Sequence, residues 1–355
     1  MIKKLIDKII FPFLRVAYTG IATCGKKSHI TTRIYQNRKM VNEQKLEFDM
    51  PNGTPSQAMF DYLSKLVKRN NYVYLATALS SINQGAIPSA NKDFFNHLGV
   101  DTENIIMLTQ NDSWSIYASR YDIEEIADRY EPIDGLDFVF PIESLIDFLR
   151  LKMDITISQD SAIAFIVCDK ASATISIYQN KMMIYSSHFI FDDDDEAEST
   201  TESPSAMNDI FDDMLSVNDI NEEIQDLDAI SDDFNSIEDI NDYMGAPDMG
   251  IDTSANNELG PDISAPELDL DEGESQQDIR RNILLFNFVK NSFNAFYKND
   301  YIESSFVSSA TIFYSHSNPN SLSQFMNNEL AIESTLIELS ISETLCDLAM
   351  HEAAL

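Results

Sequence analysis

Cysteine is scarce in this sequence, and long apolar runs are absent. The 355 residues include three cysteines, Cys24, Cys168 and Cys346, which lie far apart. This number and spacing exclude a disulfide framework and a CxxC metal site, and they favour a reducing cytoplasm. No apolar stretch approaches the roughly 18 residues of a membrane-spanning helix. The N-terminus does not resemble a signal peptide, because Asp7 and Lys8 interrupt its apolar region.

Basic residues are missing from one long segment. Residues 192–278 hold 30 Asp and Glu and no Lys or Arg, which leaves 29 acids against 24 bases elsewhere. We therefore expect a nearly balanced globular body with an acidic, disordered insert at 192–278. The balance argues against nucleic-acid binding, which needs clustered bases. Residues 1–48 are basic, but no aromatic platform or recognition helix accompanies them.

The insert nevertheless carries spaced isoleucines. Ile210, Ile220, Ile230 and Ile240 fall ten residues apart, each beside acidic residues. Such alternation of acidic and apolar residues is typical of segments that fold on a partner. The alternative is an inert solvating loop. We favour a docking segment for a second protein partner, because solvation alone requires no spaced isoleucines.

Residues 1–13 form a basic amphipathic segment. Lys3, Lys4 and Lys8 lie off the apolar face of the helix expected before Pro12. Such a helix would lie on an anionic membrane surface or pack on its own domain, and the sequence leaves both interpretations open.

The rest of the chain predicts an α/β protein with a partly repeated pattern of elements. Strands are expected at 15–24, 28–37, 45–49, 72–79, 114–120, near 137–140, within 161–191, and at 304–315 and 334–341. Helices are expected at 55–69, at 122–132 with an Asp cap, from the strand near 137–140 to residue 151, and at 278–299, 320–330 and 343–355. Residues 82–113 look irregular, with a short helix near 91–99. Two such halves suggest two sheets with helices on their faces.

Two motifs bear on phosphate binding. Residues 20–27, GIATCGKK, nearly match a P-loop, but strand-forming residues follow where a helix should begin. This favours a hairpin turn. Residues 162–191 read as strand, turn and strand, with Asp169 at the end of an apolar strand. Asp169 either caps its turn or keeps a catalytic role, and the first interpretation is the commoner one.

Together with the repeated layout, residues 167–174, VCDKASAT, resemble the second phosphate loop of the actin-like ATPase superfamily. The resemblance is to the PilM and FtsA group and to the cytoplasmic domain of GspL proteins. Asp169 and Thr174 match the loop, whereas all its glycines are replaced. In the first loop Gly20 remains, but Tyr18 stands where an Asp would be. The late glycine turn is replaced by 316–318, HSN.

The resemblance implies two RNase H-like (actin-like) subdomains of mixed sheets flanked by helices. The first would cover 14–158, with a reduced extra subdomain at 82–113. The second would cover 159–191 and 279–355, interrupted by the insert. Because side chains replace the loop glycines that let backbone N–H groups approach phosphate, we expect degenerate remnants and no nucleotide cofactor.

The expected function is a non-enzymatic one, that of a pseudo-ATPase adaptor. By resemblance, it would bind the N-terminal tail of a bitopic inner-membrane protein in a cell-envelope machine: type IV pilus, type II secretion, competence or flagellar motor accessory. It would be cytoplasmic, peripheral to the inner membrane, and able to form a homo-oligomer or ring. The alternatives are an ATP-binding ATPase with divergent loops and a scaffold that acts through its insert. The histidines show no metal-ligand spacing, so no metal is expected.

Overall fold

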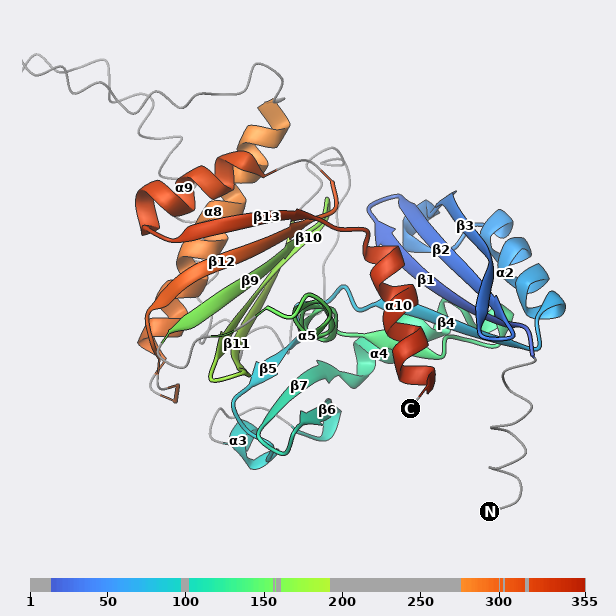
Figure 1. Cartoon of the computed structure of the whole chain (residues 1–355), viewed down its shortest axis with the longest axis horizontal. Helices are drawn as coiled ribbons and strands as arrows, with labels where there is room; N and C mark the ends of the chain where they lie inside the picture. The colour runs from blue at the N-terminus through green and yellow to red at the C-terminus, as the bar shows by residue number, and fades with distance from the viewer. Residues whose placement is uncertain are drawn as a thin grey trace, which may run out of the picture. The chain divides into compact units, whose positions relative to one another are not determined.

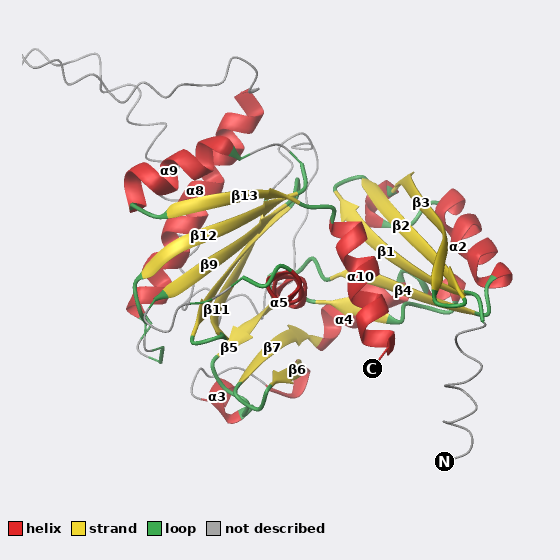
Figure 2. Cartoon of the chain, viewed as in Figure 1, coloured by secondary structure: helices red, strands yellow, loops and turns green. Residues whose placement is uncertain are grey.

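The computed structural model describes residues 14–96, 102–155, 157, 161–191, 276–299, 301–302, 304–316 and 319–354. The first sheet has the strand order β3-β2-β1-β4-β8. Its strands are β1 (Val16–Cys24), β2 (Lys27–Gln36), β3 (Lys39–Asp49), β4 (Tyr72–Ala78) and β8 (Phe138–Phe140). β1, β2 and β3 pair antiparallel, as the predicted meander requires, whereas β4 and β8 run parallel to β1 (Figure 2).

The two faces of this sheet are covered by different helices. Because side chains alternate along a strand, successive residues of β1 contribute to opposite faces. Ile21 packs with Leu63 of α2 (Gln57–Arg69). Tyr18 packs with Cys346 and Ala349 of α10 (Ile341–Ala354), which lies beside β1 in Figure 1.

The second sheet repeats the scheme of the first. Its order is β11-β10-β9-β12-β13. Its strands are β9 (Ala162–Cys168), β10 (Ser172–Gln179), β11 (Met182–Ile190), β12 (Val307–Tyr314) and β13 (Glu333–Glu338). The first three strands in sequence, β9, β10 and β11, again pair antiparallel. The other two, β12 and β13, run parallel to β9. This repeat confirms the predicted pair of RNase H-like (actin-like) subdomains.

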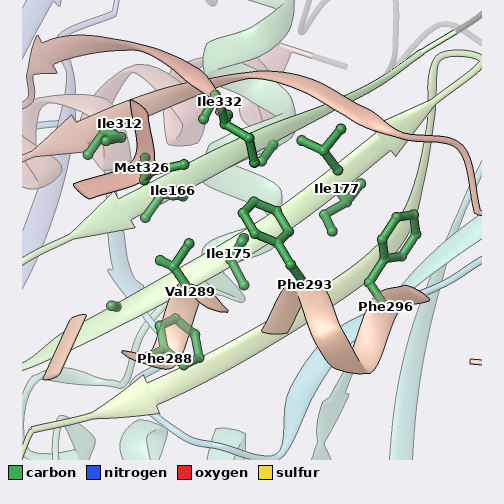
Figure 3. Close-up of a cluster of buried hydrophobic side chains, with 14 of the residues drawn as sticks. Ile166, Ile175, Ile177, Phe288, Val289, Phe293, Phe296, Ile312, Met326 and Ile332 are labelled. Carbon is green, nitrogen blue, oxygen red and sulfur yellow. The ribbon is translucent and has the colours of Figure 1, made fainter. Parts of the chain in front are cut away.

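The core of the second half lies between its sheet and two helices. Figure 3 shows Ile166 and Ile175 of the sheet beside Val289 and Phe293 of α8 (Gln276–Lys298), and Met326 of α9 (Asn320–Leu330) closes the same cluster. All five side chains are buried. Each contributes about 1.5–3 kcal/mol relative to its exposed form.

Two helices depart from the predicted division at 158/159. α5 (Ile142–Lys152) belongs to the first half in sequence, yet Ile146 and Leu149 pack with Phe165 of the second sheet. α10 follows β13 in sequence, yet it packs on the first sheet. Each half therefore supplies a helix that packs on the sheet of the other half. The sequence could not predict this exchange, because the apolar pattern of a helix shows that one face is buried but not which sheet buries it.

Residues 82–113 are more regular than expected. β5 (Gln84–Ile87), β6 (Ile105–Gln110) and β7 (Trp114–Ser119) form an antiparallel sheet in the order β5-β7-β6. α3 (Asp93–Asn96) is the predicted short helix. α4 (Arg120–Asp128) is capped by Ser119 and not by an Asp, since the Ser119 hydroxyl accepts from the Asp122 N–H. Short 3-10 turns cover Pro51–Gly53, Thr102–Asn104 and Glu131–Ile133.

Candidate functional site

The three predicted loops meet at one cavity of about 880 Å³. Cys24 lines it from the β1–β2 hairpin, Asp169 from the β9–β10 hairpin, and His316 from the segment after β12. Residues 45–47 of β3 and 337–344 between β13 and α10 complete the lining. The structure thus brings together three loops that lie far apart in the sequence.

Gly20 does not belong to the hairpin turn. The last pair of the β1–β2 hairpin joins Cys24 and Lys27, so the turn lies at Gly25, whose φ is 58°. Gly20 lies inside β1, opposite Thr31. A Cβ there would lie 2.6 Å from the backbone nitrogen of Cys346. Gly20 therefore permits the close approach of α10, and its assignment as a phosphate-loop remnant stays a prediction.

Asp169 binds the backbone of its own turn. Its Oδ1 atom accepts from the N–H groups of Ala171 and Ser172, both at 2.7 Å. Its Oδ2 accepts from the Ser172 hydroxyl at 3.2 Å, and Arg281 donates to its carbonyl oxygen. Burial raises the pKa of Asp169, and these hydrogen bonds oppose the rise. The turn-capping interpretation is confirmed.

The hydrogen bonds of Asp169 occupy the N–H groups of its loop. In a phosphate loop, backbone N–H groups are left free to bind the anion. Here the carboxylate of Asp169 takes the N–H groups of Ala171 and Ser172. An internal anion thus stands where a bound phosphate would accept hydrogen bonds.

Thr174 lies inside the second sheet. It pairs across the strands with His188, and its hydroxyl is 2.7 Å from His188 Nδ1. Both side chains are buried. Burial lowers the pKa of His188 to about 4, so the imidazole is neutral at pH 7. The Thr174 hydroxyl is therefore engaged between β10 and β11.

The thiols of Cys24 and Cys168 have raised pKa values. Burial raises the pKa of the Cys24 thiol, and the nearby charge of Asp169 raises it further. Burial also raises the pKa of Cys168 to about 12. Since the thiolate is the nucleophile, neither group is poised for attack at neutral pH.

An ion-pair network that the sequence did not reveal forms one wall of the cavity. Arg33 of β2 contacts Glu43 at 2.6 Å, Glu343 at 3.1 Å, and also Asp347. Lys45 pairs with Glu343 at 2.5 Å. Strand alternation places Arg33 and Lys45 on one face of the first sheet, but their α10 partners are about 300 residues away in sequence. No sequence signal links them.

The edge strand β3, most of whose residues are exposed, borders the cavity. β3 ends the first sheet, so one side of its backbone has no strand partner in that sheet. Met40, Val41 and Leu46 expose 51, 52 and 39% of their surface. Edge strands of this kind are templates for an added peptide strand.

Several expectations lie outside the described residues: the basic segment with Lys3, Lys4 and Lys8, the isoleucines Ile210, Ile220, Ile230 and Ile240, and positions 317 and 318 of the third loop. Within the part that is described, no cluster of His, Cys, Asp and Glu is arranged to hold a metal ion. No helix there is both long and apolar enough to cross a bilayer.

Comparison with solved structures gives low-identity matches. A protein of Bacteroides thetaiotaomicron "with actin-like ATPase fold and unknown function" matches at 10% identity and a TM-score of 0.44, over 95% of this chain and 97% of that one. The "PilM-PilN type IV pilus biogenesis complex" matches at 11% and 0.47, over 92% and 89%. Component A of the Acidaminococcus fermentans (R)-2-hydroxyglutaryl-CoA dehydratase matches at 10% and 0.38, over 96% and 100%.

No curated protein matches this sequence. Two protein-family descriptions do. Residues 14–146 match the domain of unknown function DUF8569, which covers the first sheet and the small three-stranded sheet. Residues 164–354 match the domain of unknown function DUF8341, and this match spans more than half of the 355 residues. The chain therefore belongs to the DUF8341 family.

Proposed function

We propose that this protein is a non-catalytic actin-like adaptor, which binds the cytoplasmic N-terminal tail of a single-span inner-membrane protein at the 880 Å³ cavity. It acts at the inner membrane within a cell-envelope machine, such as a type IV pilus, a type II secretion system, a competence apparatus or a flagellar motor accessory. The proposal joins the resemblance of the loops to the geometry of this site.

The self-capped turn of Asp169 carries the non-catalytic part of the proposal. A nucleotide phosphate needs free N–H donors, and Mg²⁺ needs available carboxylate oxygens. Asp169 uses its Oδ1 to hold two N–H groups, at 2.7 Å each, and its Oδ2 to hold the Ser172 hydroxyl. Phosphate binding would require breaking these contacts with no replacement for the carboxylate.

The lining of the cavity favours a basic peptide. Its carboxylates outnumber its Lys and Arg side chains: Glu47, Asp169, Glu338, Glu343 and Asp347 against Arg33, Lys45 and Lys152. Juxtamembrane segments on the cytoplasmic side are rich in Lys and Arg. An extended tail can add its backbone to the β3 edge while its basic side chains meet the acidic wall.

Site-specific photocrosslinking tests the adaptor. A photoreactive residue at Leu46, in the cavity, should crosslink to the N-terminal tail of a single-span inner-membrane protein, identified by mass spectrometry. The same residue at Val67, exposed on α2 outside the cavity, should not. Glu338→Lys should weaken the crosslink, whereas Glu329→Lys on α9 should leave it unchanged. Equal crosslinks from Leu46 and Val67 would refute the proposal.

The remaining alternatives are separated by two measurements. Isothermal titration with Mg-ATP should show no binding tighter than millimolar, and micromolar affinity would instead favour an ATPase with divergent loops. Deletion of residues 192–278 should preserve the Leu46 crosslink. Loss of all partner binding on that deletion would favour a scaffold that acts through the acidic insert.

A further inference from the structure

A second cavity, of about 480 Å³, lies between α2 and the strands β2 and β3. It is lined by Arg15, Ile34, Asn42, Gln44, Lys45, Leu46, Tyr62, Lys65, Leu66, Arg69 and Asn70. The lining contains basic side chains and no carboxylate. Four of the lining residues are basic: Arg15, Lys45, Lys65 and Arg69.

Three of these cations have no anionic partner in the described part of the chain. Arg15, Lys65 and Arg69 make no ion pair with any residue described there. Lys45 differs, because its ammonium group pairs with Glu343 at 2.5 Å. The pocket therefore presents three basic side chains without a carboxylate partner in the described part of the chain.

Arg15 is held in place by the backbone. Its N–H donates to the Asn71 Oδ1 at 3.0 Å, and its carbonyl oxygen accepts from the N–H groups of Asn71 and Tyr72. Its Nε atom is buried and has no hydrogen-bond partner among the described atoms. A guanidinium whose hydration is incomplete gains more from a nearby anion than a fully exposed one does.

The floor of the pocket is apolar. Ile34 and Leu66 are 4 and 6% exposed and pack with Ala17 in one cluster, and Leu46 adds to the lining. The hydroxyl of Tyr62 lies at the same pocket and donates to Thr32 and Gln44. The pocket thus combines a cationic rim with an apolar floor.

We propose that this pocket binds a phosphate ester: the phosphate of an anionic phospholipid headgroup or of a soluble ester. Phosphate suits a pocket lined by three basic side chains because its several oxygens can be shared among them, and arginine pairs with it in a bidentate manner. The apolar floor accommodates the carbon skeleton next to the phosphate. The pocket shares Lys45 and Leu46 with the 880 Å³ cavity, but Arg15, Lys65 and Arg69 line the pocket alone, so variants of these three test it without altering the cavity.

The test compares the full chain with two double variants of equal charge change. Lys65→Gln/Arg69→Gln removes two pocket cations. Lys68→Gln/Arg120→Gln removes one exposed cation from the same helix and one from α4, neither of which lines the pocket. Binding is measured to vesicles of phosphatidylcholine with and without phosphatidylglycerol, and to glycerol 3-phosphate by titration. Circular dichroism verifies that each variant folds.

We expect Lys65→Gln/Arg69→Gln to bind its probe about 25-fold more weakly than the natural chain, because each removed charge should cost about fivefold in affinity. The control Lys68→Gln/Arg120→Gln should lose much less affinity. Binding to phosphatidylglycerol vesicles but not to glycerol 3-phosphate assigns the site to lipid, and comparable binding of the free ester assigns it to a soluble ligand. Equal losses in both variants would show diffuse surface attraction and overturn the pocket. So would absence of binding to either probe, or displacement by polyglutamate as readily as by glycerol 3-phosphate.

Discussion

A Cβ atom at Gly20 would lie 2.0 Å from the carbonyl oxygen of Ser342. The strand β1 and the helix α10 thus pack backbone against backbone. The contact is extended by the Thr31 hydroxyl, 2.8 Å from that of Ser342, and by the Cys346 thiol, 3.2 Å from the Tyr18 carbonyl oxygen.

Gly20→Ala should therefore destabilise the protein strongly. The added methyl group meets backbone atoms of α10, which cannot rotate away, so we expect a loss of about 3 kcal/mol or more in the free energy of unfolding. Gly85→Ala is the contrasting variant, because its Cβ would meet only the Tyr117 side chain, nearest at 2.7 Å. Urea denaturation measures the free energy of unfolding of both variants. An equally small loss in the two would disprove the tight contact between β1 and α10.

Removal of the Asp169 carboxylate should weaken the turn without removing any nucleotide affinity. Asp169→Ala loses the acceptor of two N–H groups, which we expect to cost about 1–2 kcal/mol. Asp169→Asn keeps one oxygen acceptor and should cost less. Titration with Mg-ATP should show Asp169→Ala binding no more weakly than the natural chain. A large drop in affinity would instead reveal a metal-binding or catalytic carboxylate.

Glu143 should make stability depend on pH. Its side chain is fully buried, accepts from the Ser186 hydroxyl at 2.6 Å, and leaves Oε2 without a partner among the described atoms. Burial raises its pKa from 4.5 to about 7. Because the folded state holds the proton more tightly, the contribution of Glu143 to stability is fully present below pH 4.5 and is lost as the pH rises through 7. The loss should reach about 3 kcal/mol.

Glu143→Gln removes that ionisation. At pH 8 the variant should be more stable than the natural chain by about 1–3 kcal/mol, and the advantage should vanish near pH 5. Glu125→Gln, on an exposed side chain, should leave the profile unchanged. Denaturation curves across this pH range decide the matter, and parallel profiles for Glu143→Gln and the natural chain would contradict the raised pKa.

Arg33 should matter more than an exposed cation. Its side chain is 15% exposed and contacts three carboxylates. Arg33→Met leaves Glu343 with Lys45 and Asp347 with Lys152, but it removes the cation that all three carboxylates share. We expect a loss of about 2 kcal/mol, less than for a fully buried pair. Lys27→Gln breaks the exposed pair with Glu47 and should have no measurable effect. Thermal unfolding at low and high salt compares them, and equal shifts would argue against the network.

The strands were predictable because their local pattern is strong. β9, AIAFIVC, is apolar throughout and is buried at every position. β5 has four residues, with Gln84 and Gly85 at its start, and so resembles a loop in sequence. Its buried Gln84 bonds to the carbonyl oxygens of Leu79 and Ser81, contacts that a propensity scale cannot anticipate.

The site was predictable only as a set of loops. Asp169 was identified because a strand end followed by a turn is a local feature. The packing role of Gly20 against α10 was missed, since a glycine that admits a helix and a glycine that shapes a turn look the same in sequence. Arg33 was missed because its partners Glu343 and Asp347 come from the far end of the chain.

The position of α10 has a consequence for biosynthesis. The face of the first sheet that holds Val16, Tyr18 and Ala22 is translated early, yet its cover is residues 341–354. At about 5–20 residues per second, that apolar face waits tens of seconds for its helix on the ribosome. The N-terminal half therefore exposes this apolar face until the end of α10 is made, and a stop codon shortly before residue 341 would leave it permanently uncovered.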